Sequence, residues 1–302
     1  MDWRLKGTVQ KVLGYVPGGS RIHLQLQRRV GGLRDFGREC DLRVDDWAVM
    51  VRHLRAAGVT IQDATLLELG TGWFPTPALC SYLAGAGHVY TIDRVRLVEP
   101  DMLVLLADRL AVHTSLIARE SEQELDEVLG LQREVLDALE REMPLSTATR
   151  SVVDYRAPGD VTATALPNNS VDVVFSSSVL EHMPAGMIES SFAEAWRVLK
   201  PGGVMFHAVN CGDHYAYSDR SLHQLHYLQF SPHEWERWNN EFLYQNRLRA
   251  CDFVDFAKRV GFSIELEVHR STEIDGVRVD PSFAHYTRDQ LAIINVDFLA
   301  RK

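Results

Sequence analysis

The stretch Leu66–Pro77, LLELGTGWFPTP, contains the features that decide the fold. It begins with apolar residues typical of a buried strand, continues with Gly70 and Gly72, and ends in a proline-led segment typical of a helix start. Glycines in such a turn let the backbone approach a bound nucleotide closely. An aromatic pair and a proline stand where a third glycine is usual, so the stretch predicts either a modified cofactor loop or a structural turn.

Strand and helix patterns alternate along the rest of the chain. Short apolar runs predict seven strands, at residues 65–69, 88–93, 151–156, 170–176, 204–209, 263–269 and 291–299. Segments with helical spacing separate most of them, and glycines follow the helices. This alternation predicts an α/β fold with a doubly wound sheet that is mostly parallel, with an antiparallel strand at the C-terminus.

Three segments lie outside this core pattern. Residues 1–60 predict an N-terminal helical cap, which is either a lid or an oligomer contact, and residues 61–302 predict the main domain. Within the main domain, residues 95–149 are long enough for a helical insertion, and residues 211–250 for a second insertion on the substrate side. We expect a monomer or a homodimer.

Composition narrows the function classes. The net charge of −9 disfavours nucleic-acid binding, and no apolar run is long enough to span a membrane. The four cysteines form no CxxC pair, which fits a cytoplasmic protein without a disulfide framework. Residues 1–43 carry nine Lys/Arg against four Asp/Glu. This basic arm predicts a solvated face, or else a segment that meets an acidic body or an anionic substrate.

Two acidic residues indicate which cofactor the glycine turn holds. Asp93 ends the second predicted strand, where a carboxylate can accept hydrogen bonds from both hydroxyls of a ribose. Glu68 precedes the turn and would repel a pyrophosphate, but it suits a cofactor with an ammonium group. S-adenosylmethionine has a ribose, an ammonium group and a sulfonium. Alternatively, Glu68 only orders the loop by accepting backbone N–H bonds.

Four motifs occur in order: ELGTG, YTID, GDVTATALPNNSVDVVFSSSVLEHM and RVLKPGGVMFH. They resemble the class I S-adenosylmethionine-dependent methyltransferases, in particular the small-molecule, type 11-like group. The resemblance covers roughly residues 62–210 and implies a Rossmann-like fold with S-adenosylmethionine as cofactor. The loop after residues 151–156 is long, so the backbone or Thr162 is an alternative partner for the adenine. The implied cofactor-binding residues are Glu68, Gly70, Thr71, Gly72, Asp93, Arg94, Asp160, Val161 and Ser176.

The candidate catalytic residues follow the fourth and fifth predicted strands. Methyl transfer requires alignment of the acceptor with the methyl carbon and removal of a proton from the acceptor. His214 is the preferred base, with His182 as a second histidine and Asp213 as its orienting carboxylate or as a group that binds a cationic substrate. Candidate substrate-binding residues are Tyr215, Tyr217 and His207, for which packing in the core is the alternative.

Two further clusters have plainer explanations. His214, His223, His226 and His233 lack the helix-face spacing of an HExxH site, so we expect no metal. Aromatic and basic residues alternate over residues 235–249, which predicts a packed insertion or, alternatively, a substrate wall.

Three functions remain open. The first is methyl transfer to an oxygen or nitrogen atom of a small-molecule acceptor; SSSV replaces the NPPY-type motif after the fourth strand, which counts against amino methylation of nucleic-acid bases. The second is cyclisation of S-adenosylmethionine with release of methylthioadenosine. The third is a non-catalytic module that binds the cofactor.

Overall fold

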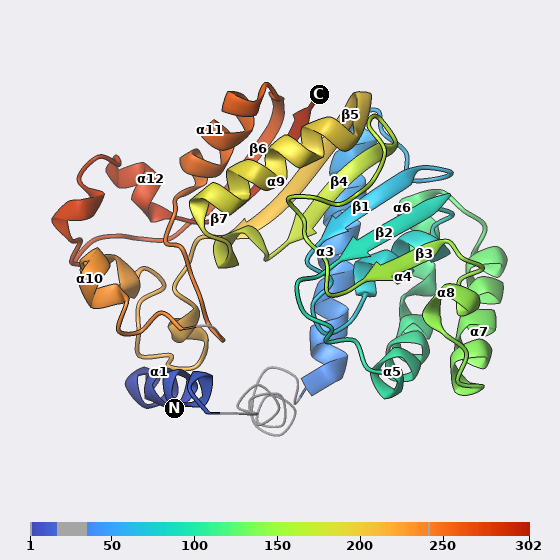
Figure 1. The fold of residues 1–302 in the computed structure, drawn as a ribbon, viewed down its shortest axis with the longest axis horizontal. Coiled ribbons are helices and arrows are strands. Elements are labelled where there is room, and N and C mark those ends of the chain that lie inside the picture. The colour runs from blue at the N-terminus through green and yellow to red at the C-terminus, as the bar shows by residue number, and fades with distance from the viewer. Residues whose placement is uncertain (1, 17–34, 241) are drawn as a thin grey trace.

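The centre of the molecule is a seven-stranded sheet with the order β3-β2-β1-β4-β5-β7-β6 (Figure 1). The structure is a computed structural model that describes residues 2–16, 35–240 and 242–302. The strand order reverses between β1 and β4, and ligands of open α/β sheets bind at the carboxyl ends of the strands beside such a point. The predicted fold, a doubly wound and mostly parallel sheet of seven strands, is confirmed.

Every predicted strand forms, with small shifts at the ends. The fifth begins earlier than expected because Leu199 pairs with Val171, and an irregularity in the register follows before Val204 pairs with Val173. Residues 201–203, Pro-Gly-Gly, are therefore part of the strand. The strands are β1 (Thr65–Leu69), β2 (His88–Ile92), β3 (Val153–Arg156), β4 (Val171–Ser177), β5 (Leu199–Asn210), β6 (Ser263–Ser271) and β7 (Ile293–Arg301).

Strand direction follows from the pairing. β3, β2, β1, β4 and β5 are parallel to their neighbours. β7 is antiparallel to both β5 and β6, so it alone runs against the rest of the sheet. β6 points the same way as β1 because two antiparallel pairings restore the direction, so β7 is the antiparallel strand expected at the C-terminus.

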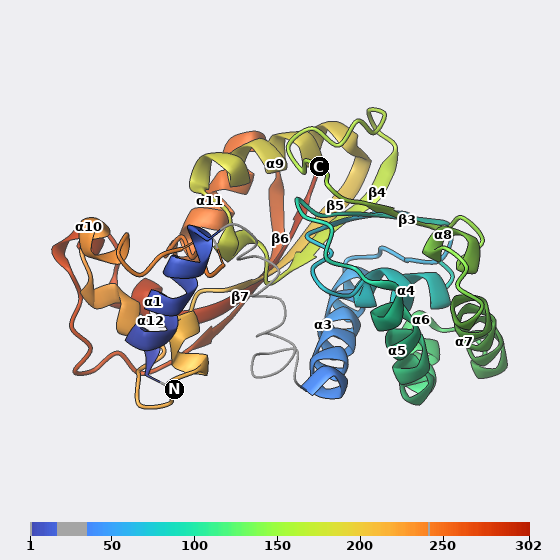
Figure 2. The same cartoon turned by 60° about the horizontal axis from the view of Figure 1, so that its bottom comes forward.

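Helices cover both faces of the sheet, as Figure 2 shows. Successive residues of β1 face opposite sides, so Leu66 packs in one buried cluster and Leu67 in the other. The first cluster lies under α3 (Phe36–Ala56), α4 (Thr76–Leu83), α5 (Pro100–Leu110), α6 (Thr114–Ser121), α7 (Leu125–Glu140) and α8 (Leu145–Ala148). The second lies under α9 (Ala185–Val198) and α11 (Ala250–Val260).

A third buried cluster lies beyond the carboxyl end of β5 and the amino end of β7. It joins α1 (Trp3–Gly14) to residues from η5 (His226–Gln229), α10 (Pro232–Trp235) and α12 (Arg288–Ala292). Trp3 of α1 has its ring 4.6 Å from that of Trp238 and 5.4 Å from that of Tyr215. The described helices of residues 1–60 therefore pack in different places, because α3 joins the helices on the sheet.

The aromatic and basic residues of 235–249 are mostly internal. Arg249 is fully buried and donates hydrogen bonds to the backbone carbonyls of Cys211 and Leu291. Arg247 is also buried and donates to the carbonyl of Tyr227. The segment packs as an insertion, and these arginines donate to backbone carbonyl groups.

In the part of the chain that the structure describes, no helix is both long and apolar enough to cross a bilayer.

Candidate functional site

The glycine turn lies at the carboxyl end of β1, at the point where the strand order reverses. Gly70 and Gly72 have φ values of +80° and +67°, which disfavour any residue with a Cβ atom. A Cβ atom at Gly70 would lie 2.6 Å from Cγ2 of Val179, whereas one at Gly72 would meet nothing within 4 Å. Gly70 thus permits close packing of the chain after β4, and Gly72 leaves its backbone open to a ligand.

Asp93 follows β2 and lies beside this turn, as its spacing predicts. Its Oδ2 accepts a hydrogen bond from the backbone N–H of Gly72 at 2.8 Å, and its Oδ1 accepts one from Val95 at 3.0 Å. Each carboxylate oxygen has a second lone pair for another donor. The loop and its acid therefore form one unit that can present a carboxylate to a pair of hydroxyls.

Glu68 acts on the turn through two threonines. It is 4% exposed, and its Oε2 accepts a hydrogen bond from Thr91 Oγ1 at 2.5 Å. Thr91 Oγ1 lies 2.6 Å from Thr71 Oγ1. Because Thr91 donates its proton to the ionised carboxylate, it accepts from Thr71. We expected Glu68 to face the cofactor or to order the loop through backbone N–H bonds. Its ordering contacts run through side-chain hydroxyls, and its direct role stays a prediction.

Burial also changes the titration of Glu68. Loss of solvent raises the pKa of its carboxyl to about 7, although the hydrogen bond from Thr91 and the charge of Arg43 oppose this shift. A cation bound nearby would favour the ionised form. The residues present therefore fit a cofactor that carries positive charge.

The aromatic residues of the turn belong to the core. Phe74 is buried, and its ring lies 5.0 Å from that of Phe36 in an edge-to-face arrangement. Trp73 packs against the same cluster. Both side chains hold α3 and α4 against the sheet, so they explain the missing third glycine by packing.

The other predicted cofactor residues lie in different environments. Asp160 is exposed, and its Oδ1 accepts from the backbone N–H and hydroxyl of Thr162, which lower its pKa. Its loop reaches β2, since the backbone N–H of Gly159 donates to the carbonyl of Asp93 at 2.8 Å. Val161 is partly buried and Arg94 is exposed.

Ser176 is buried and lies 2.7 Å (Oγ to Nδ1) from His207 on the adjacent strand. The His207 ring stacks on that of Phe192 at 5.2 Å, and burial lowers its pKa to about 3. This neutral histidine lies in the core under α9. We therefore leave His207 out of the substrate-binding set.

The candidate catalytic histidines come together beyond β4 and β5. His182 ends η3 (Leu180–His182), His214 begins η4 (His214–Tyr217), and their ring centroids are 4.9 Å apart. Nδ1 of His182 lies 2.6 Å from the carbonyl oxygen of Tyr244, so Nδ1 carries the proton and Nε2 keeps its lone pair. Burial, with His182 and Lys6 nearby, lowers the pKa of His214 to about 3.

Glu181 completes this group. One ligand atom from each of Glu181, His182 and His214 lies within 4.8 Å of the others. Glu181 is 2% exposed, and within residues 2–16, 35–240 and 242–302 neither of its carboxylate oxygens has a hydrogen-bond partner. Nε2 of His214 is likewise buried without a partner in these described residues. We call these three residues the Glu181 cluster.

Asp213 does not orient His214. Its Oδ1 accepts from the backbone N–H of Tyr215 at 2.8 Å, and its Oδ2 lies 3.0 Å from Nδ1 of His226. The expectation of an Asp213–His214 pair is therefore wrong, because the carboxylate caps the short helix and turns away. Tyr215 is also internal, since it is 1% exposed and donates its hydroxyl to the carbonyl of Trp238.

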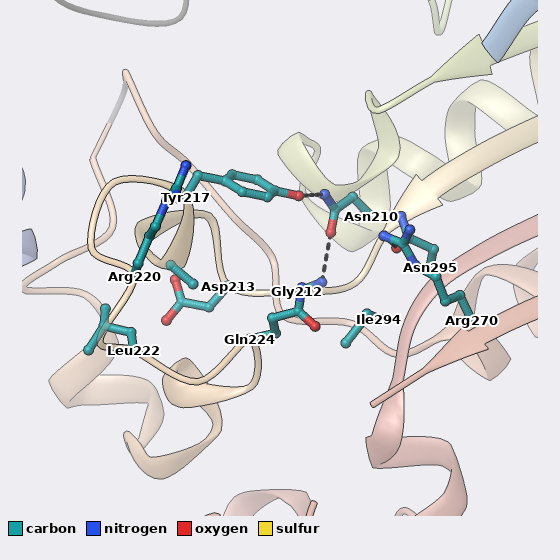
Figure 3. Close-up of a pocket in the computed structure, with 11 residues that line it drawn as sticks. Asn210, Gly212, Asp213, Tyr217, Arg220, Leu222, Gln224, Arg270, Ile294 and Asn295 are labelled. Atoms are coloured by element: carbon teal, nitrogen blue, oxygen red, sulfur yellow. Dashed lines mark hydrogen bonds between the residues drawn. The ribbon is translucent and has the colours of Figure 1, made fainter. Parts of the chain in front are cut away.

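Tyr217 lies beside a cavity of about 210 Å³ (Figure 3). Its hydroxyl accepts a hydrogen bond from the side chain of Asn210, and Asp213 and Arg270 also line the space. The Tyr217 ring lies 5.4 Å from that of His214. Tyr217 is thus the predicted substrate-side residue that reaches a cavity.

Sequence reasoning missed two residues of the site. Thr91 faces Glu68 because the two residues are partners in the β1–β2 register. The end of the predicted strand indicated Asp93, two residues later, but not Thr91. Arg43 of α3 donates a hydrogen bond to the carbonyl of Ser177, and its charge acts on Glu68 and on Glu181. No local pattern signals Arg43, because its contact spans 134 positions of the chain.

Comparisons with known proteins agree with this geometry. The sequence model of a family described as a methyltransferase domain matches residues 132–207, which include β3, β4, the Glu181–His182 pair and most of β5. The glycine turn and Asp93 lie outside the match. No curated protein matches the chain significantly.

Several solved structures are similar at low identity. A methyltransferase from Mesorhizobium loti is 15% identical with a TM-score of 0.45, over 83% of this chain and 96% of that one. The cyclase SpnF is 17% identical with a TM-score of 0.47, over 85% and 80%. A geranyl diphosphate methyltransferase in complex with S-adenosylmethionine is 13% identical with a TM-score of 0.46, over 84% of each chain. These likenesses are too weak to add to what the sheet itself shows.

The matched domain covers the centre of the sheet, and the glycine turn with its acid lies where the strand order reverses. On this evidence residues 132–207 are similar to a methyltransferase domain, and the glycine turn with Asp93 adjoins them in the sheet.

Proposed function

We propose that the protein transfers a methyl group from S-adenosylmethionine to an oxygen or nitrogen atom of a small molecule. The observation that carries the proposal is the bond between Asp93 and the backbone of Gly72, which joins the two cofactor motifs into one surface. When bound there, the cofactor supplies an electrophilic methyl group on a sulfonium.

Each part of the loop has a defined task. Asp93 accepts hydrogen bonds from the ribose hydroxyls, and Gly72 lets the cofactor approach the backbone. Glu68 holds Thr71 in place through Thr91 and adds negative charge below the sulfonium. Asp160, Val161 and Arg94 lie on neighbouring loops and flank the adenosine, and Ser176 holds the strand beneath it.

The acceptor lies on the other half of the edge. His182 and the neutral His214 face an acceptor hydroxyl or amine, and Tyr217 leads from them to the cavity beyond β5. The low pKa of His214 makes it a hydrogen-bond acceptor and a weak proton acceptor. It therefore orients the acceptor, and the proton leaves to another base or to solvent.

Calorimetry with S-adenosylhomocysteine tests the cofactor site. Asp93→Ala is expected to weaken binding by tenfold or more, because about 1.4 kcal/mol of hydrogen bonding is lost. Arg96→Ala, an exposed neighbour outside the proposed site, is the matched control and should bind normally. Equal affinity of the Asp93 variant and the wild type would remove the ribose assignment.

Product analysis then separates the three functions. Incubation with S-adenosylmethionine and a metabolite extract should give S-adenosylhomocysteine and a methylated compound. Methylthioadenosine formed from the cofactor alone would indicate cyclisation, and tight binding without any product would indicate a sensing module. A cytoplasmic location and a monomeric or homodimeric state stay predictions.

A further inference from the structure

We propose that Glu181, His182 and His214 form a binding site for a divalent first-row transition-metal ion. The residues come from two short helices, η3 after β4 and η4 after β5, and the chain folds back to bring them together. Their ligand atoms lie within 4.8 Å of one another.

The carboxylate of Glu181 is the strongest argument. It is 2% exposed and neither oxygen has a hydrogen-bond partner among the residues that the structure describes, which is costly for a buried polar group. The backbone N–H groups of Glu181 and Asn210 lie near enough to oppose the effect of burial, but neither completes a hydrogen bond. A bound cation would supply the missing partner for both oxygens.

The two histidines are prepared as ligands. The hydrogen bond from Nδ1 of His182 to the carbonyl of Tyr244 fixes the tautomer that leaves Nε2 free, as in many metal sites. Nε2 of His214 is buried and has no partner. Arg43 and Lys6 lie nearby, yet neither donates a hydrogen bond to a ligand atom of the cluster.

The ligand set indicates the class of metal. Two imidazoles and one carboxylate suit Mn²⁺, Fe²⁺, Co²⁺ or Zn²⁺, whereas Mg²⁺ and Ca²⁺ prefer oxygen ligands alone. Bonds of about 2.1 Å place neighbouring ligand atoms roughly 3 Å apart, so ligand atoms at the 4.8 Å limit would move closer together when a metal binds. His182 is exposed and Glu181 has a flexible side chain, which allows this movement.

We expected no metal because His214, His223, His226 and His233 lack the spacing of a known metal motif. The proposed site is a different set of residues and shares only His214 with them. In the structure, Nδ1 of His226 lies 3.0 Å from Oδ2 of Asp213, and Nδ1 of His233 lies 3.8 Å from Oε2 of Glu236. His214 lies beside Glu181 and His182.

Three ligands from the protein leave coordination positions open. These open positions lie at the carboxyl ends of β4 and β5, where the acceptor is proposed to bind. A metal there would hold an acceptor oxygen and lower the pKa of its hydroxyl. This role rests on the proposed function, whereas metal binding itself does not.

The test uses the full chain after treatment with a chelator. Co²⁺ and Mn²⁺ are titrated by calorimetry, and Co²⁺ is also followed by its visible absorption spectrum. We expect one ion per chain, with affinity at least tenfold weaker in Glu181→Gln, His182→Gln and His214→Gln. His269→Gln removes an exposed histidine paired with Glu267 and is the matched control, which should bind like the wild type.

No binding of either ion to the wild-type chain would overturn the proposal, as would equal affinity in all four variants. His182 is exposed, so its variant is expected to fold even if a buried variant does not. Affinity for S-adenosylhomocysteine without metal provides the folding control. If that ligand binds and no metal does, only the metal site fails; if metal binds and that ligand does not, the proposed function fails.

Discussion

The edge of the sheet has two halves, which differ in how their buried polar groups are hydrogen-bonded. The cofactor half lies at the ends of β1 and β2, and the substrate half lies at the ends of β4 and β5. Beyond β1 and β2, Glu68 accepts from Thr91, and both oxygens of Asp93 accept backbone N–H bonds. Beyond β4 and β5, Glu181 and His214 are also buried, but in the described part of the chain the carboxylate and Nε2 have no hydrogen-bond partners. The first half is ordered before its ligand arrives, whereas the second half lacks bonds that a ligand must supply.

Gly70 joins the two halves, so its replacement is expected to have the largest effect. Gly70→Ala places a methyl group against Val179 and forces alanine into the left-handed region. We expect a loss of about 2–4 kcal/mol in the free energy of unfolding, which urea denaturation measures.

Gly72→Ala is the matched control, because its Cβ atom would meet nothing within 4 Å. It should lose only about 1 kcal/mol, from backbone strain alone. Val179→Ala introduced together with Gly70→Ala should recover part of the loss. Equal losses in the two glycine variants would show that the halves do not pack through Gly70.

The pH dependence of stability tests the burial of Glu68. Its pKa rises from 4.5 to about 7 on folding, so the folded state binds more protons than the unfolded state between these values. The free energy of unfolding of the wild type should therefore fall as pH rises through this window, by up to about 3 kcal/mol relative to Glu68→Gln. Parallel pH profiles of the two proteins, measured by denaturation, would contradict the shift.

Thr91→Val tests whether the hydrogen bond from Thr91 to Glu68 orders the cofactor half. Valine keeps the shape of the side chain but leaves Glu68 without its donor, so the cofactor half comes to resemble the Glu181 cluster. We expect a loss of about 2 kcal/mol in unfolding free energy at pH 8 and weaker binding of S-adenosylhomocysteine. Thr147→Val, at an exposed position of α8 outside the proposed site, is the control. An unchanged affinity would mean that Thr71 needs no support from Glu68.

Local sequence patterns predicted the sheet and the placement of Asp93 beside the glycine turn. Buried strands have continuous apolar runs, and the turn and Asp93 each directly follow a strand, so the topology alone brings them together. The substrate half was predicted less well. Asp213, Tyr215 and His207 have the residue types of a site, but they cap a helix or pack in the core.

The contacts of the substrate half join residues that are distant in sequence, which explains why they were harder to predict. Glu181 and His214 are separated by a helix and a strand, and their approach depends on how two loops fold over the edge of the sheet. Arg43 reaches Ser177 from a helix that precedes every strand. Burial and missing hydrogen bonds are properties of this packing, and neither has a signature in a short stretch of sequence.

A crystal structure with bound S-adenosylhomocysteine tests the central claim most directly. The account predicts ribose hydroxyls within hydrogen-bond distance of Asp93, the amino acid part beside Gly70 and Gly72, and the sulfur facing the Glu181 cluster. A ligand bound elsewhere, or a ribose that makes no contact with Asp93, would contradict it.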